Sequence, residues 1–246
     1  MSASDYIEKV DEFLTVEGLK NNWTYLAVPA IFALAVFLRM IPGQGMEYFQ
    51  ALDPYMIYRM SEHLALSGNL PALDFLRYFP YETPTYVLNQ GDILFPALFY
   101  WLGPFAIFGS FLEWAQFYPA LMGGLGVVFM YLLGKELFDV RTGVLASFML
   151  ATISGVMQRT SAGFFEKEPL GTMFMMMSLW LFVRAWQNRS YVAGIGSGLA
   201  MGFFSISWGG SQMLWLMYPA VTGIMMMLNR ETESLMAALT PTAVIG

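Results

Sequence analysis

The chain has 246 residues, of which 57% are hydrophobic and only 12% are charged, and its mean hydropathy is +0.53. A water-soluble domain carries about a quarter charged residues, so this composition excludes an ordinary soluble domain, and its apolar content excludes disorder. The lack of cysteine excludes a disulfide scaffold, and 12 Lys and Arg against 18 Asp and Glu, a net charge of −6, argue against nucleic-acid binding. The composition predicts an all-α polytopic membrane protein.

The start of the chain is acidic and amphipathic, and it lacks the basic n-region and the small-residue cleavage site of a signal peptide. We expect residues 1–22 to form a cytosolic N-terminal segment. The apolar run at residues 23–41 has the length of a first transmembrane helix. Arg39 stands close enough to the end of this run for its side chain to reach the membrane interface.

Residues 42–113 predict a long external loop that contains interfacial helices. Residues 93–112 carry no charge, but Pro96 and the following Gly-Pro pair interrupt them, and only Glu113 separates them from the next apolar run. Two full spans would need a more polar turn between them. We therefore expect residues 93–112 to form a broken pair of helices that lies in the interface or half enters the membrane.

Residues 114–246 predict further transmembrane helices. The apolar runs are residues 114–133, 142–158, 169–183, 190–228 and 235–246. The fourth run is too long for one helix and is expected to fold back at the Ser-Trp-Gly-Gly-Ser segment, residues 207–211. Because the last run stops in mid-span, we expect the chain to be the N-terminal part of a longer protein.

The placement of Lys and Arg allows two orientations in the membrane. With the N-terminus inside and residues 93–112 not spanning, seven cations lie inside and four outside; with the N-terminus outside and residues 93–112 spanning, the counts are the same. The broken character of residues 93–112 favours the first orientation, which places residues 42–92 outside together with Glu166 and Glu168. This orientation predicts a multi-pass cell-membrane protein with its active site on the external face.

Three acidic residues stand at predicted membrane boundaries, namely Asp53, Glu166 and Glu168. An acid-x-acid pair can bind Mg²⁺ or Mn²⁺, because these hard cations prefer oxygen ligands, and a third carboxylate would complete the site. The alternative is helix capping, since Asp53 before Pro54 and Glu168 before Pro169 have the sequence pattern of an N-cap. The two interpretations are compatible with each other.

Arg159 ends the apolar run at residues 142–158 on the side where the positive-inside rule disfavours cations. One interpretation is an anion clamp that binds phosphate, because a guanidinium matches phosphate geometry. The other is an ion pair with Glu166.

Four segments together resemble the catalytic subunit of oligosaccharyltransferases, the membrane enzymes that N-glycosylate asparagine. Residues 53–59 are similar to the family's Asp-Pro-[Tyr/Trp]-x-x-Tyr-Arg motif, and residues 118–138 to its second span and cytosolic exit. Residues 159–168 resemble its Arg-Thr-x-x-Gly-[Tyr/Phe]-[Tyr/Phe]-Asp-x-[Asp/Glu/His] loop, and residues 207–210 its Trp-Gly-Gly turn. The charge balance and this turn favour an archaeal-type enzyme. One departure is Glu166, where the family usually has aspartate; the extra methylene can change metal preference or geometry.

The resemblance implies a C-type glycosyltransferase architecture. It implies transfer of an oligosaccharide from a dolichyl-type polyprenyl phosphate or pyrophosphate to asparagine of Asn-x-Ser/Thr sequons. Asp53, Glu166 and Glu168 would hold Mn²⁺ or Mg²⁺, with Asp53 and Arg159 catalytic, and substrate would be bound by Arg159, Trp208 and Gly209. The implied partners are the lipid-linked oligosaccharide, an acceptor polypeptide and membrane lipids.

Two parts of the family's machinery do not occur up to Gly246, namely the glutamate of a later external loop and the Trp-Trp-Asp-Tyr-Gly motif of a C-terminal soluble domain. We therefore expect the chain to be inactive by itself. Two alternatives remain open. One is another membrane glycosyltransferase that uses a polyprenyl-phosphate sugar, and the other is a non-catalytic transporter whose acids bind a coupling cation.

Overall fold

The computed structural model describes residues 23–85, 90–103, 108–228 and 232–246. The segment 1–22, predicted to be cytosolic, lies outside these residues. The described part of the chain is mostly helical, with one short hairpin and connecting loops, so the predicted all-α class is confirmed. The elements are α3 (Thr24–Met40), η1 (Ile41–Gly43), α4 (Asp53–Ser67), β1 (Leu73–Asp74), β2 (Thr83–Pro84), α5 (Gln90–Trp101), α6 (Phe111–Leu137), α7 (Val140–Thr152), α8 (Ser154–Arg159), α9 (Lys167–Asn188), α10 (Tyr191–Ser207), η4 (Gly209–Ser211), α11 (Gln212–Met227) and α12 (Thr232–Ile245).

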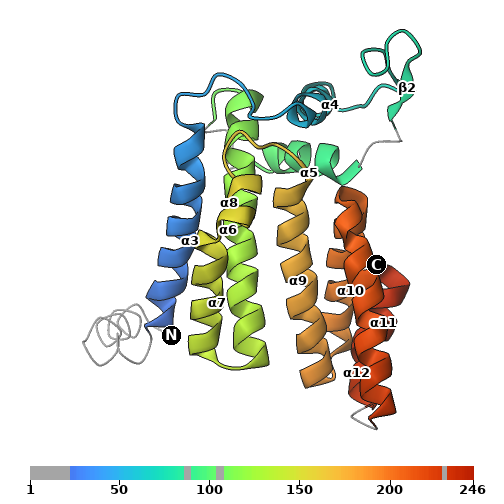
Figure 1. Cartoon of the computed structure of the whole chain (residues 1–246). Coiled ribbons are helices and arrows are strands. Elements are labelled where there is room, and N and C mark those ends of the chain that lie inside the picture. The colour runs from blue at the N-terminus through green and yellow to red at the C-terminus, as the bar shows by residue number, and fades with distance from the viewer. Residues whose placement is uncertain (1–22, 86–89, 104–107, 229–231) are drawn as a thin grey trace, which may run out of the picture.

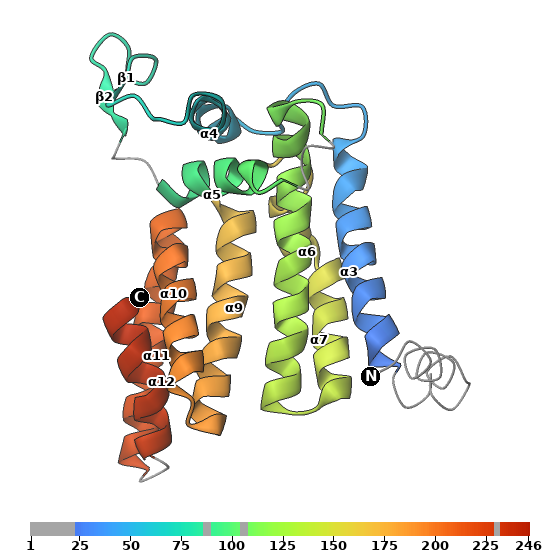
Figure 2. The same ribbon diagram turned by 180° about the vertical axis from the view of Figure 1, so that it is seen from behind.

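The longer helices stand side by side as a bundle, and two helices lie across one end of it (Figures 1 and 2). Helix α9 packs against both α6 and α10, α6 packs against α3 and α7, and α12 packs against α10. Helices α4 and α5 form the crossing layer. The antiparallel β1–β2 hairpin, with Leu73 opposite Pro84, extends beyond that layer.

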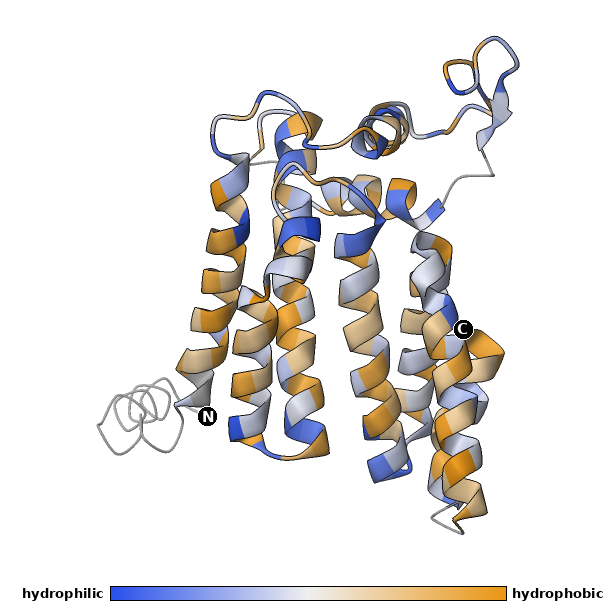
Figure 3. Cartoon of the chain, in the orientation of Figure 1, coloured by the Kyte–Doolittle hydropathy of each residue, from blue (hydrophilic) through white to orange (hydrophobic). Residues whose placement is uncertain are grey.

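The bundle helices are apolar along their middles, whereas hydrophilic residues gather at their ends and in the crossing layer (Figure 3). Two described helical stretches are long and apolar enough to cross a bilayer, Leu26–Gly43 and Phe111–Leu137. The helices Val140–Thr152, Tyr191–Ser207 and Glu233–Ile245 are apolar but shorter. The number of membrane spans therefore stays a prediction.

Several helices begin at side chains that accept a backbone hydrogen bond, as helix N-termini require. Ser110 accepts from the Glu113 amide at the start of α6, Asp139 from the Thr142 amide at α7, and Ser190 from the Ala193 amide at α10. The predicted reversal of the fourth apolar run is also confirmed, because α10 ends at Ser207 and α11 begins at Gln212 after the η4 turn.

The main core runs along the bundle as far as Phe182 and Ala185 of α9, and it is rich in aromatic residues where α6, α9 and α10 meet the crossing layer. Trp114, Tyr118, Phe165 and Phe204 are almost fully buried there. The indole nitrogen of Trp114 donates to the Pro96 carbonyl at 2.9 Å, which ties α5 to α6. Such rings bury large apolar areas, so this cluster fixes the crossing layer on the bundle.

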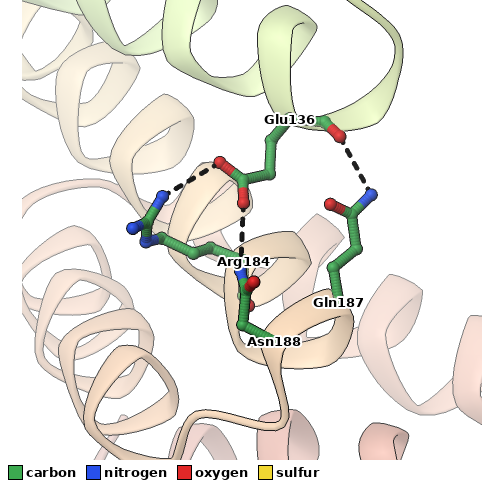
Figure 4. A network of polar contacts seen from close by, with 4 residues as sticks. All are labelled: Glu136, Arg184, Gln187 and Asn188. Carbon is green, nitrogen blue, oxygen red and sulfur yellow. Dashed lines mark hydrogen bonds and ion pairs between the residues drawn. The ribbon is translucent and has the colours of Figure 1, made fainter.

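At the opposite end of the bundle, a polar network joins the ends of α6 and α9 (Figure 4). The Glu136 carboxylate accepts from Arg184 Nη1 and from Asn188 Nδ2, both at 3.2 Å. Gln187 Nε2 donates to the Glu136 carbonyl at 2.9 Å. Helix α9 thus runs from this network to the crossing layer, about 33 Å at 1.5 Å per residue.

Two sequence predictions about α3 and α7 are wrong. Residues 142–158 do not form one helix, because α7 ends at Thr152 and Ile153 is extended, with φ −65° and ψ 120°, before α8 begins. Arg39 does not reach an interface, because its side chain is fully buried beside α7. The two corrections share a cause, since Arg39 bonds to the carbonyls at the end of α7.

Candidate active site

The loop between α8 and α9, residues 160–166, is held by backbone contacts to three other segments. The Ala162 amide donates to the Arg39 carbonyl at the end of α3, at 2.8 Å, and the Gly163 amide donates to the Gln116 carbonyl of α6, at 3.1 Å. Gln50, which precedes α4, donates from its backbone amide to the Gly163 carbonyl and from its side-chain Nε2 to the Ala162 carbonyl. These bonds fix the loop relative to α3, α6 and the start of the crossing layer.

Acidic and basic side chains from α4, α8 and α9 meet next to this loop. Lys167 Nζ lies 3.9 Å from Asp53 Oδ2, which joins the first turns of α9 and α4. Arg159 Nη1 at the end of α8 lies 3.9 Å from Glu168 Oε1. The structure therefore brings Asp53, Arg159 and Glu168 to one end of the bundle, although Asp53 is far from the other two in sequence.

Glu166 is buried in the same cluster, and the neighbouring charges change the pKa of its carboxyl. The pKa of the Glu166 carboxyl is raised to about 7, chiefly by burial and also by the negative charges of Glu168 and Asp53, against the opposing charges of Lys167 and Arg159. A buried carboxylate beside two others is unfavourable when ionised. The cluster thus holds more negative charge than its own cations balance.

The capping interpretation of Asp53 and Glu168 is wrong. Asp53 is the first residue of α4, whose N-cap position is Leu52, and Glu168 is the second residue of α9, whose N-cap position is Glu166. Neither cap residue makes a side-chain cap hydrogen bond. The Asp-Pro and Glu-Pro patterns therefore leave both carboxylates available for other partners.

The donor chemistry of the cluster fits a hard divalent cation. Glu168 Oε2 is buried and has no hydrogen-bond partner among the residues that the structure describes, which is costly for a carboxylate oxygen unless an ion or donor faces it. Over the described ranges, however, no three His, Cys, Asp or Glu side chains lie close enough together to enclose a metal. The ligand set of Asp53, Glu166 and Glu168 therefore stays a prediction.

Arg159 is exposed and free to meet an anion on one side. Its side chain is 59% exposed, and its guanidinium lies over the Phe164 ring at 5.1 Å from the centroid. The acid that forms an ion pair with it is Glu168, whereas the second of the two sequence interpretations was an ion pair with Glu166. The ring contact orients the guanidinium by cation–π attraction.

Sequence reasoning missed the aromatic support beneath the cluster. Phe165 is 1% exposed and stacks on Phe49 at 5.9 Å between centroids, and it also contacts the Tyr118 ring at 5.6 Å. Phe49 also contacts Tyr58 of α4 at 5.2 Å. The paired phenylalanines of the loop motif were the one signal available, but their partners come from distant segments.

Trp208 and Gly209 lie at the α10–α11 reversal, beside the beginning of α9. A Cβ on Gly171 would lie 2.7 Å from the Trp208 ring, so the glycine allows that ring to pack one turn beyond Glu168. Gly209 is exposed. The reversal thus shares the end of the bundle with the acidic cluster, and a substrate contact by Trp208 or Gly209 stays a prediction.

Comparison with known proteins identifies the family. The N-terminal model of oligosaccharyl transferase STT3 matches residues 23–246, and the chain belongs to this family. A dolichyl-diphosphooligosaccharide–protein glycosyltransferase subunit STT3B from Oryza sativa is 24% identical over 89% of this chain and 31% of its own length. The STT3 subunit of Saccharomyces cerevisiae is 25% identical over 88% of this chain. The chain thus spans about a third of the curated relatives that it matches.

The fold is that of a solved archaeal relative. The apo oligosaccharyltransferase of Archaeoglobus fulgidus matches 92% of this chain and 29% of its own, with a TM-score of 0.80 and 19% sequence identity. Archaeoglobus fulgidus oligosaccharyltransferase has also been solved with zinc and sulfate and with a tethered acceptor peptide containing an NVT sequon, and AglB of this organism with an inhibitory peptide and a dolichol-phosphate.

Proposed function

We propose that this chain is the N-terminal membrane part of an oligosaccharyltransferase. The whole protein would transfer an oligosaccharide from a dolichyl-type phosphate or pyrophosphate to asparagine of an Asn-x-Ser/Thr sequon. The single observation that carries the proposal is the meeting of Asp53, Glu166, Glu168 and Arg159 at one end of the bundle. The dolichol-phosphate and sequon-peptide complexes of the archaeal relative support these two substrates.

The residues of the cluster have separable roles in such a transfer. A bound Mn²⁺ or Mg²⁺ would neutralise charge on the leaving phosphate, and the zinc and sulfate complex of the archaeal relative supports a metal in this family. Asp53, Glu166 and Glu168 would supply its oxygen ligands. Arg159, exposed beside Glu168, would hold the phosphate through paired N–H donors.

The acidic cluster also serves the acceptor. An asparagine amide is a poor nucleophile, and carboxylates that accept hydrogen bonds from its N–H groups stabilise the charge that develops as its nitrogen attacks the sugar. Asp53 is suited to this because its side chain is 66% exposed. Trp208 and Gly209 at the neighbouring reversal would contact substrate.

The same arrangement favours a multi-pass protein with its site on the external face. Asp53 begins α4 and Glu166 precedes α9, so the acids lie beyond the apolar middles of the bundle helices. A transporter with a coupling cation requires acids near the middle of the bilayer, and this position does not favour that alternative.

Glycan transfer by the purified full-length protein tests the proposal. A polyprenyl-linked oligosaccharide and a fluorescent Asn-x-Thr peptide are incubated with Mn²⁺, and glycopeptide is measured for wild type, Asp53→Asn and Glu168→Gln. We expect product from wild type and at least a tenfold loss in both variants. Glu233→Gln, at a side chain 91% exposed and far from the cluster, is the matched control. Equal turnover in all four proteins would contradict the assignment, and residues 1–246 alone should give no product.

Cysteine labelling tests the membrane side. Residues 1–246 contain no cysteine, so in this chain a cysteine introduced at Leu52 or at Arg141 is the one thiol that a reagent can label. An impermeant maleimide should label the first from outside the cell and the second only after permeabilisation. Labelling of both from the same side would refute the predicted orientation.

A further inference from the structure

Arg39 is a fully buried arginine whose partners are almost all backbone carbonyls. Its Nη1 donates to the carbonyls of Ala35 and Ala151, both at 3.0 Å, and its Nη2 to the Leu150 carbonyl at 3.4 Å. Its Nε donates to Thr160 Oγ1 at 2.8 Å. No acidic side chain of the described ranges forms an ion pair with it. Its hydrogen bonds, not a counterion, account for its burial.

These partners lie at a break in the helical path. Helix α7 ends at Thr152, and the last carbonyls of a helix lack intrahelical donors. The Ile153 amide still donates to the Met149 carbonyl, at 2.9 Å. The next two carbonyls, of Leu150 and Ala151, are the ones that Arg39 takes. A cation at a helix C-terminus is also favoured by the helix dipole. Arg39 therefore stabilises the α7–α8 break, whose backbone carbonyls would otherwise lack donors among apolar helices.

Arg39 also contacts the residues that follow α8. Thr160, which accepts from its Nε, follows Arg159 directly and donates its own hydroxyl to the Val156 carbonyl at 2.7 Å. The main-chain carbonyl of Arg39 accepts from the Ala162 amide at 2.8 Å. Arg39 of α3 therefore forms hydrogen bonds both with the end of α7 and with the loop that leads to Glu166.

The room for this contact comes from a glycine of α6. A Cβ on Gly123 would lie 2.6 Å from Arg39 Nε and 2.8 Å from Thr160 Cβ, closer than real Cβ atoms approach their neighbours. A methyl group there would press the two residues apart. A Cβ built on Gly223 of α11 has no other atom of the described residues within 4 Å, so Gly223 provides a matched control.

We propose that Arg39 is a positioning residue for the active site: by satisfying the α7–α8 break and holding Thr160, it sets the place of Arg159 and of the turn at Glu166 and Glu168. This inference rests on the proposed function for its catalytic consequence, but its geometric part does not. Disturbing the contact should move α8, weaken divalent-cation binding and raise the KM for the lipid-linked donor more than it lowers kcat.

The geometric part is tested by a distance measurement in the full-length protein. Spin labels on cysteines at Gln158 in α8 and Leu66 in α4, two exposed positions, report how α8 sits relative to the crossing layer. We expect one narrow distance distribution for wild type and for Gly223→Ala. The distribution should shift or broaden for Gly123→Ala, Thr160→Val and Arg39→Lys, because a single ammonium cannot reach the four acceptors of the guanidinium. Unchanged distributions in these three folded variants would overturn the proposal.

The catalytic part is tested by Mn²⁺ affinity, read by electron paramagnetic resonance, and by donor kinetics on the same preparations. We expect Gly123→Ala to raise the Mn²⁺ Kd and the donor KM at least fivefold, with Gly223→Ala as wild type and Glu168→Gln as the reference for loss of a ligand. If Glu168→Gln weakens binding while Gly123→Ala does not, the positioning role is contradicted and the proposed site stands. If Glu168→Gln has no effect, the proposed site fails, and the distance data alone decide whether Arg39 positions α8.

Discussion

Lys167 offers a prediction whose direction is opposite to that of the ligand substitutions. Its ammonium lies 3.9 Å from Asp53, so a cation that binds Asp53 competes with it. Replacing Lys167 by Gln should therefore tighten Mn²⁺ binding. Lys167→Arg, which keeps the charge, should bind as wild type does.

The exposure of the pair limits the size of this effect. Two unit charges about 4 Å apart interact by about 1 kcal/mol in water. The Asp53 side chain is 66% exposed and that of Lys167 is 34% exposed. Exposed pairs are worth at most about 1 kcal/mol, and since about 1.4 kcal/mol is tenfold, Lys167→Gln should lower the Kd by up to about fivefold. Salt should reduce the gain, because the Debye length is about 10 Å at 0.1 M.

The assay is a Mn²⁺ titration followed by electron paramagnetic resonance at pH 8, in low salt and in high salt. The pH matters because Lys167 also lowers the pKa of Glu166, so its loss would favour the protonated carboxyl near neutrality. Weaker or unchanged Mn²⁺ binding by Lys167→Gln at low salt would refute the reasoning, because Lys167 would then not compete with the metal for Asp53.

Three further predictions concern the rest of the fold. Burial alone would raise the pKa of the Asp74 carboxyl, but hydrogen bonds from Arg59, at 2.6 Å, and from the backbone outweigh it and lower that pKa. The stability that this group contributes is present above about pH 4 and is lost as the pH falls through the lowered pKa. Hydrogen exchange should therefore show the β1–β2 hairpin opening in acid. Asp74→Asn should remove this pH dependence. Glu136→Ala should lower the free energy of unfolding by about 1 kcal/mol in thermal denaturation while the Mn²⁺ Kd stays constant, and a changed Kd would refute its purely structural role. Tyr218→Phe, which loses the 2.8 Å contact with Ser178, should cost about 1 kcal/mol, and no loss would show that the hydroxyl contributes nothing.

The sequence predicted the helical class, the family and the reversal at residues 207–211 because each depends on local features, namely uncharged length, short motifs and a glycine pair. It did not predict the break at Ile153, since residues 142–158 contain no charge and no proline. The break depends on Arg39, which is distant in sequence and supplies donors to the carbonyls of Leu150 and Ala151.

The candidate site shows the same division. The motifs selected Asp53, Glu166, Glu168 and Arg159, and the structure brings these residues to one end of the bundle. Their partners were not predictable, because the Lys167–Asp53 and Arg159–Glu168 distances follow from how α4 and α8 are placed against α9. The capping pattern misled for a related reason, as the chain before each proline enters the helix one or two residues earlier than the pattern implies.

The most direct test of the central claim is the stoichiometry and affinity of Mn²⁺ bound to the full-length protein, compared among wild type, Asp53→Asn, Glu168→Gln and the double variant. If residues of α4 and α9 share one ion, wild type binds one tight Mn²⁺ and each single variant weakens it at least tenfold. The double variant should lose less than the two single losses combined, because the ligands act on the same ion. A wild-type Kd in Asp53→Asn, or two independent ions, would contradict the account.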